Sequence, residues 1–416
     1  MAWRIFSELF LTTAGTGTVS VIARDRFRRA LDADASPLKR GPSFISHFLL
    51  VTNLHQRHKP QFAGEWVRLG DLCTKGKSSL RQKDLKNDGP YLVYGASGVV
   101  GTSSEYQNEE PYVAVVKDGA GVGRVMACEP HSSVLGTMQA LLPNETTDRD
   151  YLLHLVESLK LGQEFTGSTI PHIYFKDYGK TPVKALTIAK QTKVASALNQ
   201  IDRLVGLGKQ QLSALDDLAK SEFVEMFEGV DKVVELGEVC KFVSGKSLPK
   251  EIELPNGDCL YAKVGDLNLD GNERLITRSR TYVSFESAKG SLIPSGAVVF
   301  PKRGGAIGTN KKRITALNCC LDLNLMAVIP SSLVATEYLY WFFRLIDLNK
   351  IANGSTVPQI NNKDLRPLRF PLPPLALQQQ FADFVAEVDK LRFDCCREIV
   401  CCGVLFSSMS ASLLCT

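Results

Sequence analysis

The first candidate for chemistry is the glycine-rich loop Gly119–Gly123, which follows the apolar run Tyr112–Val116. A glycine loop after a strand can hold a phosphate with its backbone N–H groups. The glycines are spaced G-x-G-x-G rather than G-x-G-x-x-G, and no clear helical run follows them. A nucleotide-dependent enzyme that uses the Gly119–Gly123 loop is therefore an alternative hypothesis rather than the leading one.

A second loop, Pro301–Gly308, repeats the pattern of a lysine followed by glycines two and six positions later. It opens a twelve-residue stretch that contains no acid and five cations, which are Lys302, Arg303, Lys311, Lys312 and Arg313. Cations neutralise DNA phosphates, and the amide of Asn310 could read an adenine edge. The first loop offers Lys117 and Arg124. A solvated surface loop is the alternative, but glycines between cations allow close approach and favour DNA contact.

Hydroxyl groups recur in two further segments, Gly167–Pro171 and Gly354–Pro358, which both read Gly-Ser-Thr-x-Pro. The hydroxyls belong to Ser168, Thr169, Ser355 and Thr356. The proline in each segment prevents a helix from continuing. These residue types suit either the cap of a structural turn or a phosphate site, and the sequence leaves both open.

The residue pattern offers no catalytic, cofactor-binding or metal-binding set. No Ser/His/Asp order and no carboxylate pair recurs in the two halves, and His172 is matched by Gln359. The eleven cysteines contain no C-x-x-C spacing, and vicinal pairs such as Cys395-Cys396 suit tetrahedral zinc poorly. Reduced, structurally incidental cysteines are the better interpretation. The sequence predicts a binding protein that is not an enzyme and binds no cofactor directly.

These motifs belong to a long internal repeat. Four segments recur in the same order, and the offset between the copies grows once, from 167 to 185–187 residues. The pairs are Val67–Cys73 with Val234–Cys240, Val116–Gly123 with Pro301–Gly308, Tyr151–Leu153 with Tyr338–Tyr340, and Gly167–Asp177 with Gly354–Asp364. A period this long indicates two whole domains rather than a solenoid. The growth in offset predicts an insertion of about 18 residues in the second copy, around Asp270–Lys289.

Each copy ends in a helix-like segment whose apolar residues are spaced alternately four and three apart. The residues expected to pair the helices are Val194, Leu198, Ile201, Val205, Leu212 and Leu215 in the first segment, and Leu377, Phe381, Phe384, Val388 and Leu391 in the second. A period of 3.5 residues is typical of helices that pack along their length against a partner helix. A helix lying on its own domain is the alternative for one copy, but two matching seams favour pairing. The first helix, of about 37 residues, would be about 55 Å long.

Charge and hydropathy indicate which partners and which cellular location to expect. Residues 1–63 hold nine Lys/Arg and four Asp/Glu, which accounts for the whole net charge of +5. Only local clusters in the neutral remainder can therefore indicate a nucleic-acid partner. No apolar run approaches the length of a membrane span and no signal-peptide pattern is present, which predicts a cytoplasmic protein. Residues 1–63 have no counterpart in the second half and are expected to be an atypical, poorly ordered leader.

Over about residues 64–395 the chain resembles the DNA-specificity (S) subunit of type I restriction–modification systems. The resemblance is carried by Trp66–Leu72, Tyr261–Leu267, both Gly-Ser-Thr-x-Pro-x-Ile elements, Phe370–Phe381 and the Ala195–Met226 segment with its ending Ser221–Phe227. It implies an α+β fold with two similar mixed α/β target-recognition domains. Each domain would be followed by a long helix, and the two helices would pair as an antiparallel coiled coil. Each domain would read one half of a bipartite DNA sequence, and the helices would set the gap.

The resemblance also implies partners and site residues. Members of this family are not catalytic, bind double-stranded DNA and have no membrane partner. They dock two DNA methyltransferase (modification) subunits, which use S-adenosylmethionine, and two restriction/translocase subunits, which use ATP and Mg. The DNA-facing residues would be Lys117, Arg124, Ser168, Thr169, Lys302, Arg303, Asn310, Lys311, Lys312, Arg313, Ser355 and Thr356. A coiled-coil scaffold without DNA affinity is a further alternative.

The expected boundaries follow from the repeat. They are a leader at 1–63, the first target-recognition domain at 64–185, the first spacer helix at 186–228, the second target-recognition domain at 229–371, the second spacer helix at 372–396 and an atypical tail at 397–416. The second helix is expected to be shortened, because beyond Phe393 charge almost vanishes and Ser and Cys replace the apolar seam.

Overall fold

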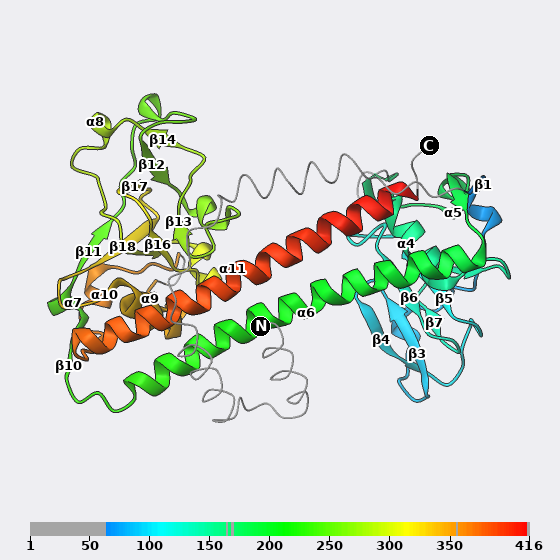
Figure 1. The fold of residues 1–416 in the computed structure, drawn as a ribbon, viewed down its shortest axis with the longest axis horizontal. Coiled ribbons are helices and arrows are strands. Elements are labelled where there is room, and N and C mark those ends of the chain that lie inside the picture. Colours follow the sequence, from blue (N-terminus) through cyan, green and yellow to red (C-terminus); the bar gives the residue numbers. More distant parts are fainter. Residues whose placement is uncertain (1–63, 164, 168–169, 355–356, 414–416) are drawn as a thin grey trace, which may run out of the picture. The chain divides into compact units, whose positions relative to one another are not determined.

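The computed structural model describes residues 64–163, 165–167, 170–354 and 357–413 (Figure 1). The leader expected at 1–63 lies outside these residues. The described chain contains two domains of the same topology, each followed by a long helix.

The first domain contains three small sheets. Their strand orders are β1-β9, β2-β8-β5-β6 and β4-β3-β7, and all pairs are antiparallel except β3 with β7. Its elements are β1 (Glu65–Arg68), β2 (Cys73–Lys75), β3 (Tyr91–Gly95), β4 (Gly98–Ser103), β5 (Tyr112–Val116), β6 (Val125–Cys128), β7 (Ser133–Val134), β8 (Met138–Pro143), α4 (Arg149–Ser158), α5 (Phe175–Tyr178) and β9 (Pro182–Ala185). The strand β5, mostly β-branched, is buried on both faces because apolar clusters cover it from either side.

The second domain repeats this plan. Its strand orders are β10-β19, β11-β18-β15-β16-β13 and β14-β12-β17, and β12 again pairs in parallel with β17. Its elements are β10 (Val233–Glu235), α7 (Leu236–Val239), β11 (Cys240–Ser244), β12 (Cys259–Ala262), β13 (Leu275–Ile276), β14 (Tyr282–Val283), α8 (Phe285–Ala288), β15 (Val298–Pro301), β16 (Arg313–Thr315), β17 (Cys319–Leu321), β18 (Leu325–Pro330), α9 (Thr336–Leu345), α10 (Asn362–Leu365) and β19 (Arg369–Pro371).

The two domains differ most where the repeat predicts an insertion. Residues 96–97 connect β3 to β4, whereas residues 263–281 connect the corresponding strands β12 and β14. The added segment contains a short 3₁₀ helix, Val264–Asn268, and strand β13, which extends the second large sheet. It overlaps the predicted range and begins before it.

Two long helices follow the domains, α6 (Ile188–Phe227) after the first and α11 (Leu375–Ser412) after the second. Figure 1 shows α6 in green and α11 in red running side by side. Phe223 contacts Phe381, Asp216 pairs with Arg392, and Gly208 accepts a bond from the thiol of Cys395 at 3.2 Å. Since the partner number rises as the α6 number falls, the helices are antiparallel.

The expected shortening of the second helix is wrong. The helix α11 continues to Ser412, beyond the predicted end at 396, although its sequence there is rich in Ser and Cys. Apolar contacts hold this end, because Leu413, with Phe406 and Met409, joins the buried cluster formed by α4 and the start of α6. The tail therefore completes the core of the first domain.

The predicted helix-pairing residues are buried to different degrees. Val194, Leu198, Leu215, Phe381 and Val388 are buried, while Ile201, Val205, Leu212, Leu377, Phe384 and Leu391 are half-buried. The 3.5-residue seam missed Val385, which is 1% exposed against the second domain. It also missed two buried glutamines, Gln191 and Gln378.

Within the described part of the chain, α11 is long and apolar enough to cross a membrane by length and composition alone. A single helix of this kind is weak support for a membrane protein. In this structure, α11 packs along α6 and against both domains.

Phe381 carries much of the packing between α11 and the second domain. It is fully buried, and its ring lies 5.2 Å from Phe223 and 6.0 Å from Trp341 between centroids. Phe381→Ala should lower the free energy of unfolding by about 3–5 kcal/mol, because it removes a ring from a filled core. Urea unfolding measures this loss. Leu405→Ala, on the exposed side of the same helix, is the control, and an equal loss in both variants would contradict this account of the packing.

His154 lies where α4, α6 and α11 meet, and it is 1% exposed. Its Nδ1 is 3.2 Å from a carboxylate oxygen of Glu157, and its Nε2 is 2.7 Å from Oδ1 of Asn199. The Asn199 amide is oriented by its own bond to Asp150 at 2.8 Å. Because both partners are acceptors, this arrangement favours the doubly protonated, cationic imidazole.

Stability should therefore depend on pH through His154. Burial opposes the imidazolium, but the bonds to Glu157 and Asn199 and the nearby Asp202 carboxylate outweigh it and raise the pKa of His154. A raised folded-state pKa gives stability that is complete below the unfolded pKa and disappears as pH rises through the folded pKa. The stability difference between the natural chain and His154→Gln should shrink as the pH rises from below the ordinary histidine pKa of about 6.5 through the raised pKa of His154. Urea unfolding measures it, with the exposed His131→Asn as control, and a difference that grows with pH would contradict it.

Candidate nucleic-acid interface

In the first domain, the lysine–glycine loop and the Gly-Ser-Thr segment bond directly to each other. The N–H of Gly119 donates to the carbonyl of Pro171, and the N–H of Ile173 donates to the carbonyl of Lys117, both at 3.0 Å. The sequence shows the two motifs 54 residues apart, from Asp118 to His172, and gives no sign that they touch.

The second domain forms the same pair of bonds. The N–H of Gly304 donates to the carbonyl of Pro358, and the N–H of Ile360 donates to the carbonyl of Lys302, both at 2.8 Å. The two sequence motifs are therefore one structural unit, present once in each domain. We call this unit the loop–hairpin element, made of residues 117–124 with 166–167 and 170–173, and of residues 302–309 with 353–354 and 357–360.

Each hairpin closes through a glycine that has a left-handed backbone. The φ angles are +97° at Gly167 and +105° at Gly354, and the strands on either side exchange two backbone bonds. A side chain at either position would also meet the carbonyl of the residue three positions later. Glycine is thus needed for the turn itself. The hydroxyl residues Ser168, Thr169, Ser355 and Thr356 lie outside the described residues, so their assignment to DNA stays a prediction.

The Gly119–Gly123 loop lacks the geometry of a phosphate-binding loop. It joins β5 to β6, which are antiparallel, and Val116 and Arg124 close it with a backbone bond of 2.8 Å. No helix starts at the loop, and the N–H of Gly119 already bonds to the hairpin. Phosphate-binding loops use free N–H groups at a helix N-terminus. Gly123 has φ of +82° and packs against Gly162, which explains the glycine without a nucleotide.

The loop–hairpin elements carry different side chains at the same position. In the first domain, Asp118 faces His172, with an oxygen–nitrogen distance of 2.7 Å. In the second, Arg303 faces Gln359. The backbone frame is therefore duplicated, while the charge it presents changes from a carboxylate to an exposed guanidinium.

Three of the predicted cations in the second domain lie where a ligand can reach them. Arg303 is exposed. Lys311 is half-buried, and its ammonium donates a hydrogen bond to Oδ1 of Asn268. Lys302 is half-buried and bonds to the hydroxyl of Ser244 at 2.9 Å. Burial and the charge of Arg303 lower the pKa of Lys302.

The other three predicted residues of this stretch bond to other groups of the protein. Lys312 is 3% exposed, and its ammonium donates to Asn310 Oδ1 and to the carbonyl of Ile346, both at 2.7 Å. Burial lowers the pKa of Lys312 to about 8. Arg313 is half-buried and donates to two backbone carbonyls, and Asn310 also accepts from the N–H of Leu348 at 2.9 Å. The buried ammonium of Lys312 is used inside the protein, while the assignment of Asn310 and Arg313 to DNA stays a prediction.

The first domain offers fewer cations and more apolar surface. Lys117 is half-buried, and Arg124 is exposed with a weak bond of 3.4 Å to the carbonyl of Ala96. Beside the hairpin, Ile170 and Tyr174 are about half exposed, and Lys176 lies over the Tyr174 ring at 5.3 Å. Sequence reasoning missed these apolar residues, because a single exposed aromatic residue in a loop gives no periodic signal.

The cysteines of the described residues do not gather into a metal site. No group of three or more His, Cys, Asp or Glu side chains in the described part of the chain could hold a metal ion. Burial raises the pKa of the Cys73, Cys128 and Cys240 thiols to about 12, so these groups stay protonated.

Comparison with known proteins decides the family. The sequence profile of the type I restriction modification DNA specificity domain matches residues 64–216 and again residues 230–398. The chain belongs to this family. As a member, it confers DNA specificity in a restriction–modification system, it is not a catalytic subunit, and the two matched ranges correspond to the two repeats.

Relatives and solved structures agree with this placement. The chain is 23% identical over 398 residues to the type I restriction enzyme MjaVIII specificity subunit of Methanocaldococcus jannaschii, covering 83% of this chain and 91% of the relative. It is 22% identical to the putative type I restriction enzyme specificity subunit S.HindORF215P of Haemophilus influenzae, covering 79% and 88%. The fold is similar to the crystal structure of a type I restriction-modification S subunit from M. genitalium, with a TM-score of 0.58, 14% identity and coverage of 86% and 98%. The expected α+β fold with two recognition domains is confirmed.

The exposed and buried cations should separate in their effects on DNA binding. Arg303→Gln should weaken binding to duplex DNA and make the dependence on salt shallower by about one unit of slope, because one phosphate contact is lost. Lys312→Met should instead lower the free energy of unfolding by about 1–3 kcal/mol, because it removes the bonds of the Lys312 ammonium to Asn310 Oδ1 and to the carbonyl of Ile346. Binding titrations at several salt concentrations and urea unfolding measure the two effects. A shallower slope for Lys312→Met with unchanged stability would reverse these roles.

Proposed function

We propose that each domain reads one half of a bipartite duplex DNA target and that α6 and α11 set the gap between the halves. The single observation that carries this proposal is the loop–hairpin element, whose backbone bonds are the same in both domains while the side chains differ. A duplicated frame with Asp118 and His172 in one copy and Arg303 and Gln359 in the other suits two different half-sites. Base edges are read by side chains, so changed side chains mean a changed sequence.

The cations of the loop–hairpin element in the second domain suit a surface that faces DNA phosphates. Arg303 is exposed, and Lys302 and Lys311 are half-buried along the same loop. In the first domain, Lys117 and Arg124 take the corresponding place. Cations on a loop anchor the DNA backbone and leave the neighbouring side chains to read bases.

The partners are those of the family. We propose that the chain docks two DNA methyltransferase subunits, which supply S-adenosylmethionine chemistry, and two restriction/translocase subunits, which use ATP and Mg. The relatives named above are restriction-enzyme specificity subunits, which supports this assembly. The specificity subunit would supply binding alone, and the complex would act in the cytoplasm.

Methylation mapping tests the proposal. The chain is co-expressed with its methyltransferase subunit, and methylated adenines are mapped across the host DNA. We expect one split motif with a fixed gap. Replacing Arg303 and Gln359 by the first-domain residues, as Arg303→Asp with Gln359→His, should alter or abolish reading of one half only. The matched control is Arg124→Gln, which should leave that half unchanged.

Two outcomes would overturn the proposal. A soluble complex that leaves DNA unmethylated, or methylates without a split motif, would exclude two-part reading. Loss of both half-sites in the Arg303→Asp, Gln359→His variant, with normal stability, would exclude separate readers in the two domains.

A further inference from the structure

A second duplicated feature lies at the joint between each domain and its long helix. Gln191, near the start of α6, is 1% exposed, and Gln378, near the start of α11, is fully buried. The two positions are separated by the repeat offset of 187 residues seen in the C-terminal part of each domain. Since buried amides are costly unless bonded, their partners identify what they hold.

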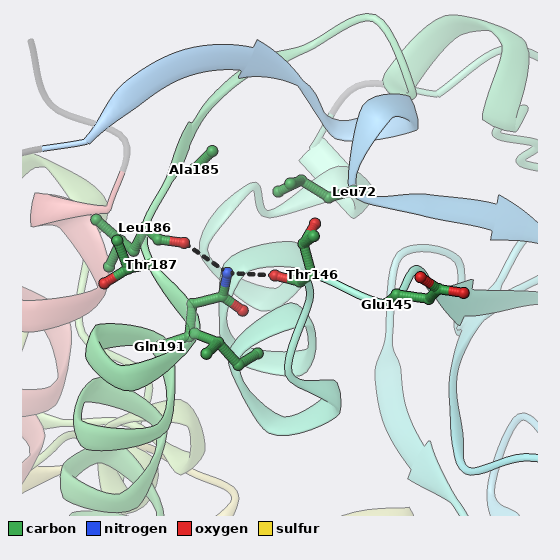
Figure 2. Close-up of a pocket in the computed structure, with 8 residues that line it drawn as sticks. Leu72, Glu145, Thr146, Ala185, Leu186, Thr187 and Gln191 are labelled. Carbon is green, nitrogen blue, oxygen red and sulfur yellow. Dashed lines mark hydrogen bonds between the residues drawn. The ribbon is translucent and has the colours of Figure 1, made fainter.

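In the first domain, the side-chain amide of Gln191 forms three hydrogen bonds. Its Oε1 accepts from the N–H of Asp148 at 2.7 Å. Its Nε2 donates to the carbonyls of Thr146 at 2.9 Å and Leu186 at 2.7 Å, the two bonds drawn in Figure 2. Asp148 is the residue that caps α4, and Leu186 comes just before α6. One side chain thus ties the entry to the spacer helix to the start of the domain's own helix.

The second domain repeats these bonds. Gln378 accepts from the N–H of Ala335 at 2.8 Å and donates to the carbonyls of Leu333 at 3.1 Å and Pro373 at 2.9 Å. Each partner is the residue 187 positions after its counterpart in the first domain. The partners in both domains are backbone groups, so these bonds depend on the side chain of the glutamine and not on the side chains of its partners.

These bonds tie each long helix to its domain and do not cap it, because none of them goes to an N–H group of the first turn of α6 or α11. Neither Thr187 before α6 nor Pro374 before α11 makes a side-chain capping bond. Without the glutamine, the entry to each long helix would lose its bonds to the segment that begins the domain's own helix.

We propose that Gln191 and Gln378 are positioning residues that fix the angle between each recognition domain and its spacer helix, and through it the gap between the two half-sites. This inference rests on the proposed function. The helix α6 has 40 residues and is therefore about 60 Å long. A rotation of about 4° at one end would move the far domain by roughly 4 Å, which exceeds the rise of about 3.4 Å per base pair.

The test uses the complete methyltransferase complex and a set of duplexes. Each duplex carries the two half-sites mapped for the natural complex, with the natural gap or a gap one or two base pairs longer or shorter. Gln191→Met and Gln378→Met keep the length of the side chain and remove its bonds. In each variant the preference for the natural gap over neighbouring gaps should fall by about tenfold, while the half-site sequences stay the same.

Matched controls separate positioning from a loss of stability. The hydroxyl of Tyr151 donates to the backbone carbonyl of Lys184 at 2.6 Å, and the hydroxyl of Tyr338 donates to the backbone carbonyl of Pro371 at 2.7 Å. Both tyrosines are buried, and each bond lies inside one domain. Tyr151→Phe and Tyr338→Phe should lower stability without changing the gap preference. If the Met variants do not fold, Gln191→Glu keeps the acceptor and, when protonated, one donor, and should show a smaller loss of preference.

The outcomes distinguish a positioning role of the two glutamines from a purely structural one. Equal loss of methylation at every gap, with an unchanged ratio, would make the glutamines merely structural and overturn the inference. The same ratio change in the tyrosine controls would do so as well. A natural complex with no gap preference would overturn the proposed function and the inference with it.

Discussion

The close antiparallel contact between α6 and α11 is the interaction on which the rest of the fold depends. Gly208 makes this approach possible, because any side chain there would meet Ile399, and its carbonyl accepts the thiol of Cys395. Near the second domain, Asp216 of α6 pairs with Arg392 of α11 and with Arg344 of α9 at 2.6 Å. Burial opposes the charge of Asp216, but Lys220, Arg344 and Arg392 lower its pKa. The two helices and the second domain are therefore joined through one half-buried carboxylate.

The ends of the two helices complete the domains that they do not follow. The C-terminal end of α11 brings Leu413 into the core of the first domain, and the end of α6 brings Phe223 and Phe227 into the core of the second. Each core is thus built from segments far apart in the sequence. Long-range contacts of this kind make the two recognition domains part of one cooperative structure, because loosening one helix end exposes apolar surface in the opposite domain.

The duplication could be predicted from sequence, because it appears as ordered segments with a nearly constant offset. The long helices could also be predicted, since a period of 3.5 residues is a local pattern. The location of the insertion could be predicted only in part. The change in offset between the two copies gives the size of the insertion, but it does not show which strands the insertion separates. The length of α11 was missed, since its C-terminal part owes its stability to packing on another domain rather than to its own composition.

The sequence by itself determined the two-domain plan, the family and the residue types available for binding DNA. Only the tertiary structure decided which of these residues are available. Lys302, Arg303, Lys311, Lys312 and Arg313 read as one cationic cluster, yet Lys312 is buried and bonded to the end of α9, while Arg303 is exposed. The same is true of Gln191 and Gln378, which read as ordinary helix residues and are fully bonded inside the protein. The physical reason is that burial and hydrogen bonding depend on partners from distant segments, which no local pattern contains.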